Sequence, residues 1–269
     1  MSDHTYEEVS AMIESSMSRI KYKILVGSGK GGVGKSTFAV NLAYGLMFHG
    51  NSVGILDADI HGPSLGKMLG IEGQKNPPSL NELIQPVEKN GIKVISISSF
   101  IQNPDDPIAW RGPVKGSVLR QFLGEVEWGE LDYLIIDLPP GTGDEAISIA
   151  QSVLKINGII IVTTPQDVAL LDARKAVSFA NALNVPVIGI VENMSGYTCP
   201  KCGEKIDLFK KGGGEKSASE LKIDFLGFIP IDINIVNTSD AGEPFVFKYG
   251  KTENGKLFMN IVEKVISKI

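Results

Sequence analysis

The two cysteines of the chain form a C-x-x-C pair, Cys199 and Cys202. Thiolates at this spacing bind zinc or an iron–sulphur cluster, but the usual site of either kind needs four ligands. The three histidines, His4, His49 and His61, lie far upstream and do not cluster in the sequence. The chain therefore supplies half of a four-thiolate site, and spacing alone does not choose between zinc and iron–sulphur.

A second candidate site is a glycine-rich segment, GSGKGGVGKST, at residues 27–37. It fits G-x-x-x-x-G-K-[ST], a loop whose backbone N–H groups converge on nucleotide phosphates, and it stands between an apolar run and a helical pattern. We predict that Lys35 reaches the β- and γ-phosphates and that the Ser36 hydroxyl binds Mg²⁺. The residues predicted to bind ATP are Gly29, Lys30, Gly31, Gly32, Val33, Gly34, Lys35, Ser36 and Thr37.

Lys30 is an additional lysine that the ordinary loop pattern does not require. Its ammonium group could be a solvated charge. It could also reach a phosphate bound to a second subunit and stabilise the transition state, as an arginine finger does. The residues alone leave both interpretations open.

Aspartates follow two of the apolar runs, where they would complete a site for hydrolysis. Such a site needs carboxylates around magnesium and a group that orients the attacking water. We assign Asp137 and Asp57 to magnesium together with Ser36, with a turn cap as the alternative for Asp57. Asp144 is either a ligand or the N-cap of a helix that begins at Glu145.

Seven short apolar runs are predicted to be strands that position these residues. They cover residues 24–26, 53–56, 94–97, 133–136, 159–162, 187–191 and 225–229. Continuous apolarity is typical of parallel strands covered on both faces, and helical patterns such as residues 35–49 alternate with the runs. The predicted fold is α/β, a single doubly wound and mainly parallel sheet of the P-loop NTPase type, in which ligands bind beyond the carboxyl ends of the strands.

The predicted organisation is an N-terminal extension, helical or flexible, over residues 1–20, followed by one ATPase domain over residues 21–269. Loop-rich excursions cover residues 62–91 and 98–116, and a third carries the C-x-x-C pair at about residues 196–216. A net charge of −5 argues against a nucleic-acid surface. The polar N-terminus lacks the features of a signal peptide, so we expect a cytoplasmic protein without a membrane partner.

Several segments together resemble a known family. The GKGGVGKST loop is similar to the deviant Walker A loop of a superfamily that includes the MinD cell-division ATPases and the nitrogenase iron protein. The segments DADIHGPS, WRGP, DLPPGTGD, VENMS and CPKC follow in that order, beginning at residues 57, 110, 137, 191 and 199. With the loop, they look like the Mrp/Nbp-type iron–sulphur cluster carrier ATPases over residues 20–265.

The resemblance implies a slow ATPase that uses ATP and Mg²⁺ and is coupled to cluster carriage. It implies that Lys30 contacts nucleotide on the partner subunit, that Asp59 positions the attacking water, and that Asn193 recognises adenine rather than only forming a turn. Cys199 and Cys202 from each of two subunits would hold one bridging [4Fe–4S] cluster, in a homodimer or with a paralogue. Apo iron–sulphur proteins and cluster scaffold proteins would be the partners.

Three other functions compete with a cluster carrier. A MinD- or ParA-like positioning ATPase would use the apolar stripe of the C-terminal segment, residues 256–269, on a membrane, although a helix closing the core explains the same stripe. A zinc ion in a Cys₄ site would clamp a dimer structurally. A thioredoxin-like redox pair fits least, since the C-x-x-C pair does not open a helix.

Overall fold

The centre of the protein is a nine-stranded, mainly parallel sheet with the strand order β3-β4-β2-β5-β1-β6-β7-β8, and β9 also pairs with β7. The computed structural model describes the chain except residues 1–4, 79–82, 101–109, 111 and 154. The strands are β1 (Ile20–Gly27), β2 (Val53–Asp57), β3 (Val87–Lys89), β4 (Ile92–Ile95), β5 (Leu131–Asp137), β6 (Gly158–Thr163), β7 (Val187–Thr198), β8 (Lys205–Ile206) and β9 (Phe225–Ile231).

The seven predicted strands are all found, and the predicted doubly wound α/β sheet is confirmed. The strand predicted at residues 94–97 ends at Ile95, because a 3₁₀ helix follows at Ile97–Ser99. β7 is longer than its apolar run and continues almost to Cys199. Strands β3 and β8, which the apolar pattern did not predict, are short antiparallel additions to β4 and β7.

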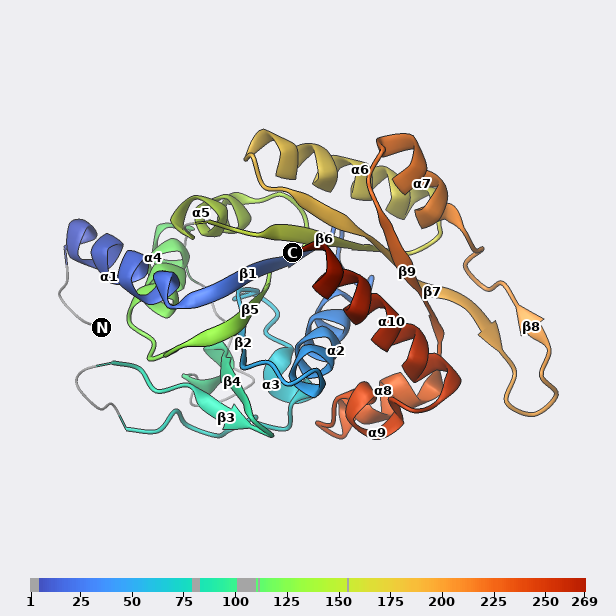
Figure 1. Cartoon of the computed structure of the whole chain (residues 1–269), viewed down its shortest axis with the longest axis horizontal. Coiled ribbons are helices and arrows are strands. Elements are labelled where there is room, and N and C mark those ends of the chain that lie inside the picture. The colour runs from blue at the N-terminus through green and yellow to red at the C-terminus, as the bar shows by residue number, and fades with distance from the viewer. Residues whose placement is uncertain (1–4, 79–82, 101–109, 111, 154) are drawn as a thin grey trace.

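Helices cover both faces of the sheet (Figure 1). They are α1 (Tyr6–Ser18), α2 (Lys35–Phe48), α3 (Leu65–Met68), α4 (Gly112–Gly124), α5 (Asp144–Ser152), α6 (Asp167–Ala182), α7 (Gly213–Leu221), α8 (Ile233–Asp240), α9 (Phe245–Tyr249) and α10 (Glu253–Lys268). One core cluster includes buried residues of α1, α4, α5, α6 and α7, and the other includes those of α2, α9 and α10. The buried strands read as continuous apolar runs because both of their faces are covered.

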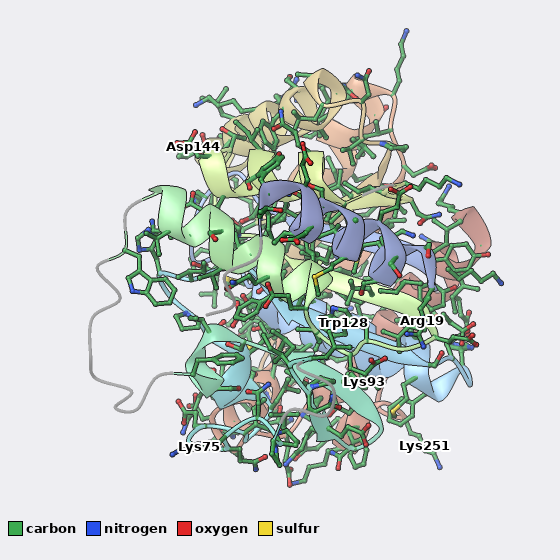
Figure 2. The ribbon with its side chains drawn as sticks, turned by 90° about the vertical axis from the view of Figure 1, so that its left-hand side faces the viewer. Arg19, Lys75, Lys93, Trp128, Asp144 and Lys251 are labelled. Carbon is green, nitrogen blue, oxygen red and sulfur yellow. The ribbon has the colours of Figure 1, made fainter. Side chains whose placement is uncertain are left out.

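Helix α1 packs on α4 through an apolar stripe. Thr5 caps it in a capping box with Glu8, and Val9, Ile13 and Met17 are buried. Figure 2 shows α1 beside α4, with Arg19 at the C-terminal end of α1 and Trp128 and Lys93 below the helix in this view. This part of the N-terminal segment therefore contributes to the main core, since its buried residues belong to the cluster that includes β1 and α4.

Helix α10 closes the other face of the sheet. Its stripe of Phe258, Ile261, Val262 and Val265 is buried against β9 and α2. Of the two explanations for this stripe, the helix that closes the core is confirmed, and the stripe does not form an exposed apolar face. Among the described residues, no helix combines the length and apolarity that crossing a bilayer requires.

Candidate functional site

The glycine-rich loop joins β1 to α2 at the carboxyl edge of the sheet. Gly34 has a left-handed backbone (φ 83°), which glycine adopts without strain, and directly precedes the helix. Gly29 lies so close to the backbone of Asp172 that a Cβ atom would collide with it. The chain therefore needs glycine here for both conformation and close packing, and the N-terminus of α2 faces the space in which phosphates would bind.

Lys35 and Asp137 form a buried ion pair beneath this loop. The Lys35 Nζ donates to Asp137 Oδ1 at 2.7 Å and to Ser36 Oγ at 3.2 Å. The side chains of Lys35 and Asp137 are 7% and 0% exposed. The predicted phosphate-binding lysine and two predicted magnesium ligands thus meet at one point.

Asp57 and Asp137 stand opposite each other, because they are paired in register on the adjacent strands β2 and β5. Asp57 accepts hydrogen bonds from Ser96 Oγ at 3.0 Å and from the Leu65 and Asp59 amides. Burial, reinforced by the Asp137 carboxylate, raises the pKa of Asp57 to about 7. Burial also raises the pKa of Asp137, against the opposing effect of Lys35.

The chemistry of these oxygens fits a magnesium ion. Asp137 Oδ2 is buried and has no hydrogen-bond partner among the described residues. A carboxylate oxygen in this condition is costly unless a cation or an ordered water satisfies it. Mg²⁺ prefers carboxylate, hydroxyl and water oxygens, which Ser36, Asp57 and Asp137 can provide together.

Asp59 faces the glycine-rich loop across a cavity of about 200 Å³. Its carboxylate accepts the Gly62 amide at 3.2 Å, so the turn after β2 is folded around it. The side of the cavity nearest the loop is lined by Lys30, Lys35, Ser36 and Thr37. All three predicted catalytic residues, Lys30, Lys35 and Asp59, therefore border one cavity.

Asn193 lies at the other end of the loop. Its Nδ2 donates to the Val33 carbonyl at 2.8 Å, and the residue borders a second cavity of about 340 Å³ with Pro230 and Asp232. Gly34 and Thr37 line both cavities, which are therefore adjacent. Asp232 caps α8 and accepts Asn254 Nδ2 at 2.7 Å, so structural contacts already occupy its carboxylate.

Of the two roles considered for Asp144, a ligand or an N-cap, the N-cap is wrong. Helix α5 begins at Asp144 itself, and its N-cap is Gly143, which offers no side chain to the helix. The Asp144 carboxylate instead stands in the first turn, where the helix dipole favours a negative charge. Arg111 lies outside the described residues, and Trp110 packs partly buried against the core.

The C-x-x-C pair forms the tip of a hairpin made by β7 and β8. The tip is closed by hydrogen bonds from the Gly203 amide to the Cys199 carbonyl and from the Cys199 amide to the Glu204 carbonyl, both 2.9 Å. Hydrogen bonds from the Cys202 and Lys201 amides lower the pKa of the Cys199 thiol, which favours the thiolate that binds metals. Within the described ranges, no group of three or more histidine, cysteine or acidic side chains could hold a metal, so the pair has no further ligands of its own.

Glu192 is a site residue that the sequence reasoning missed. It is fully buried, and its carboxylate accepts the Gly212 amide at 2.9 Å and the Gly214 amide. It therefore fixes the point at which the cysteine-bearing segment returns to the core. The signal was the triple glycine at 212–214, since a Cβ on Gly214 would stand 3.0 Å from that of Glu192.

The family model and the relatives that match this chain agree with one another. A family model described as "NUBPL iron-transfer P-loop NTPase" matches residues 19–266. A protein of Methanocaldococcus jannaschii named "Iron-sulfur cluster carrier protein" is 51% identical over 96% of this chain and 90% of its own length. A protein of Saccharolobus solfataricus with the same name is 48% identical over 97% and 88%.

Solved structures agree on the fold. A nucleotide-binding protein in complex with ADP from Archaeoglobus fulgidus superimposes with a TM-score of 0.78 at 41% identity, covering 89% of this chain and 93% of its own. The cell-division ATPase MinD of Pyrococcus furiosus gives a TM-score of 0.65 over 91% and 98%. At 21% identity, the second match bears on the fold alone.

Proposed function

The chain belongs to the NUBPL-type iron-transfer P-loop NTPase family, and from this premise we propose that it is an ATP-hydrolysing carrier of [4Fe–4S] clusters. One observation carries the proposal. A C-x-x-C pair, in which Cys202 is exposed and Cys199 partly exposed, stands at the end of the strand that also bears Asn193 beside the glycine-rich loop, and the described part of the chain offers it no further ligands. A cluster site and a nucleotide site thus share one structural element.

Two copies of the chain would complete the cluster site. A two-fold axis through the cluster brings Cys199 and Cys202 of each copy together, and four thiolates are the usual complement of a [4Fe–4S] cluster. The cluster is the cargo, and apo iron–sulphur proteins would receive it. Scaffold proteins would be further partners, and we assign the carrier to the cytoplasm.

The nucleotide site supports hydrolysis through residues with distinct tasks. The loop amides and Lys35 bind the phosphates, and Asn193 contacts the base beside the cavity it borders. Asp59 accepts a hydrogen bond from the attacking water and orients it, while Lys30 of the second subunit adds positive charge near the γ-phosphate. Ser36, Asp57 and Asp137 would hold Mg²⁺, which neutralises charge on the phosphate oxygens when bound.

The experiment is anaerobic reconstitution with iron and sulphide, followed by iron and acid-labile sulphide analysis and mass in solution. We expect about one cluster per dimer, and none for Cys199→Ser, because by symmetry each such change removes two of four ligands. Lys201→Ala is the matched control, since it keeps both thiols and the backbone amides that bind Cys199. A clusterless dimer that holds one zinc ion would show that the cysteines form a structural zinc site and that the chain is not a cluster carrier. A cluster on a monomer would contradict the proposal that the cluster bridges two subunits.

A further inference from the structure

Lys115 is a buried lysine on α4 that lies next to the site and has no assigned role. Only 6% of the residue is exposed. Its Nζ donates to Glu145 Oε1 at 3.0 Å and contacts His61 Nε2. An ammonium group only donates, so Nε2 of His61 is the acceptor in this contact.

A buried ammonium group is costly unless it is paired and hydrogen-bonded. Glu145 provides the opposite charge, and the hydrogen bond from Lys115 lowers the pKa of the Glu145 carboxyl. Separating such a pair would leave an uncompensated buried charge. Each side chain therefore constrains the position of the other. His61, 61% exposed, adds a third element to the cluster.

The cluster joins the two loops that carry the predicted hydrolytic residues. His61 follows Asp59 by two positions in the loop after β2, and Glu145 lies in the first turn of α5, at the end of the loop that begins after Asp137. Lys115 lies between them on a different element. A single side chain therefore connects the segments that border the nucleotide cavity from two sides.

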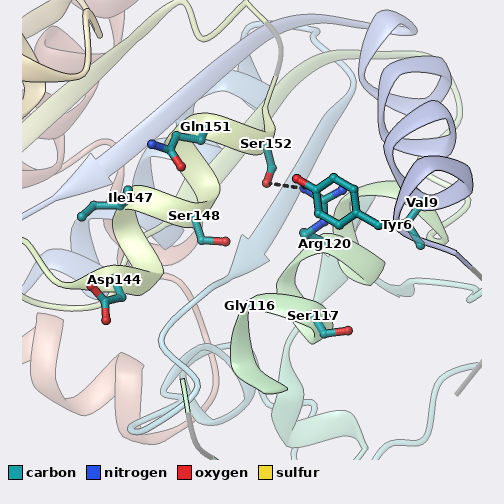
Figure 3. A pocket seen from close by; sticks show the side chains of 10 residues that line it. All are labelled: Tyr6, Val9, Gly116, Ser117, Arg120, Asp144, Ile147, Ser148, Gln151 and Ser152. Atoms are coloured by element: carbon teal, nitrogen blue, oxygen red, sulfur yellow. Dashed lines mark hydrogen bonds between the residues drawn. The ribbon is translucent and has the colours of Figure 1, made fainter. Parts of the chain in front are cut away.

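Helix α4 has a firm attachment at its other end. The Arg120 guanidinium donates to Ser10 Oγ of α1 at 2.7 Å and to Ser152 Oγ of α5 at 3.3 Å, and it lies 4.1 Å from the centre of the Tyr6 ring. Figure 3 shows Arg120 beside Tyr6 and Ser152, with Asp144 at the opposite end of α5. Helices α4 and α5 are thus joined at both ends, which fixes Lys115 relative to Glu145.

We propose that Lys115 is a positioning residue for ATP hydrolysis: it holds the loop after β2 against α5 so that Asp59 faces the γ-phosphate. The proposal rests on the proposed ATPase function and deepens it. Helix α4 begins at Gly112, three residues before Lys115, and so brings this lysine to the site. Lys115 itself touches no nucleotide-binding residue in this arrangement and acts through His61 and Glu145.

The first test compares Lys115→Met with Lys115→Arg in the full chain. We expect Lys115→Met to lower kcat by about tenfold or more, because small misplacement of a reacting group has large effects on rate. The affinity for Mg-ATP should change by less than about threefold, since the loop amides and Lys35 remain. Lys115→Arg keeps the charge and should recover part of the rate.

Lys23→Met is the matched control. Lys23 is also a buried lysine, 4% exposed, but its Nζ donates to the carbonyls of Met17 and Ile20, near the amino-terminal end of β1. It should lower thermal stability and leave kcat unchanged. Glu145→Gln should reproduce the effect of Lys115→Met, and the double variant should be no worse than either single change, because both act through one contact.

Amide hydrogen exchange separates this proposal from the ATPase proposal. Lys115→Met should accelerate exchange in residues 58–64 and 141–147 of the nucleotide-free protein, and Lys23→Met should not. Accelerated exchange with an unchanged kcat, or unchanged exchange, would overturn the positioning role while ATP hydrolysis stands. A wild-type chain that binds ATP without hydrolysing it would overturn the ATPase proposal and, with it, a hydrolytic role for Lys115, even if exchange responds.

Discussion

At the scale of single residues, the site has one buried ammonium group for two buried carboxylates. Lys35 pairs with Asp137, and Asp57, in register beside it, relies on Ser96 and backbone amides. Two carboxylates at such positions do not both ionise easily, because like charges and desolvation each favour the neutral form. The raised pKa values of Asp57 and Asp137 follow from this imbalance.

The imbalance predicts a pH dependence of stability. The pKa of Asp57 rises from 3.8 to about 7 on folding, so between these values the folded chain holds a proton that the unfolded chain releases. The free energy of unfolding should therefore fall as pH rises towards 7 and level off above it. Asp57→Asn should flatten this dependence in urea titrations of the nucleotide-free protein. Equal slopes in both proteins would show that Asp57 does not titrate in this range.

The conformation of the glycine-rich loop could be predicted because the spacing of its glycines alone dictates backbone geometry. The start of α5 could not be predicted, since the helix begins one residue earlier than the polar pattern indicates and Gly143, rather than Asp144, becomes the cap. Lys115, His61 and Glu145 are distant in the sequence, and no periodicity connects them. Packing of α4 against both α5 and the loop after β2 brings them together.

At the scale of elements, the strands were predictable where both faces are buried and were missed at the edges. β3 and β8 contain mostly polar or exposed residues, and pairing with a neighbour, rather than their own composition, makes them strands. Helix α10, by contrast, was visible in the sequence pattern, but the pattern did not determine what the helix packs against. Its apolar stripe predicts burial but does not choose between a core and a membrane, which only the packed structure distinguishes.

Phe258 tests the role of α10. Its ring is buried and lies 6.1 Å, between ring centroids, from both Phe38 and Phe245. Phe258→Ala should lower the free energy of unfolding by about 3–5 kcal/mol, because it leaves a cavity in the core. Glu263→Ala, an exposed change on the same helix, should cost about 0.5 kcal/mol or less in the same urea titrations. Similar losses for both variants would contradict the packing role of the stripe.

At the scale of the whole molecule, the features that remain incomplete in one chain are those that two chains would complete. Cys199 and Cys202 offer two thiolates, and Lys30 borders the nucleotide cavity with no hydrogen bond or ion pair of its ammonium group to the described residues. Both observations support the proposed dimer, in which each nucleotide site draws one residue from its neighbour.

A mixing experiment tests this exchange. Lys30→Ala and Asp59→Asn should each hydrolyse ATP slowly on their own, while their mixture should recover activity. In half of the sites of a mixed dimer, an intact Asp59 then meets an intact Lys30 from the other subunit. Native mass spectrometry would establish that mixed dimers form. Mixed dimers without recovered activity would argue that Lys30 acts within its own subunit.

Strand β7 links the nucleotide loop mechanically to the cysteine pair. It runs for 12 residues, passes Asn193 beside the nucleotide loop, and ends next to Cys199. Between the two, Met194 and Gly196 have left-handed backbones (φ 56° and 78°), and the pairing with β9 shifts register. A strand rises about 3.3 Å per residue, so the three residues from Gly196 to Cys199, beyond the irregularity, make a lever arm of roughly 10 Å. With its pivot at this irregularity, a tilt of about 10° would displace the thiols by roughly 2 Å relative to the loop that Asn193 contacts.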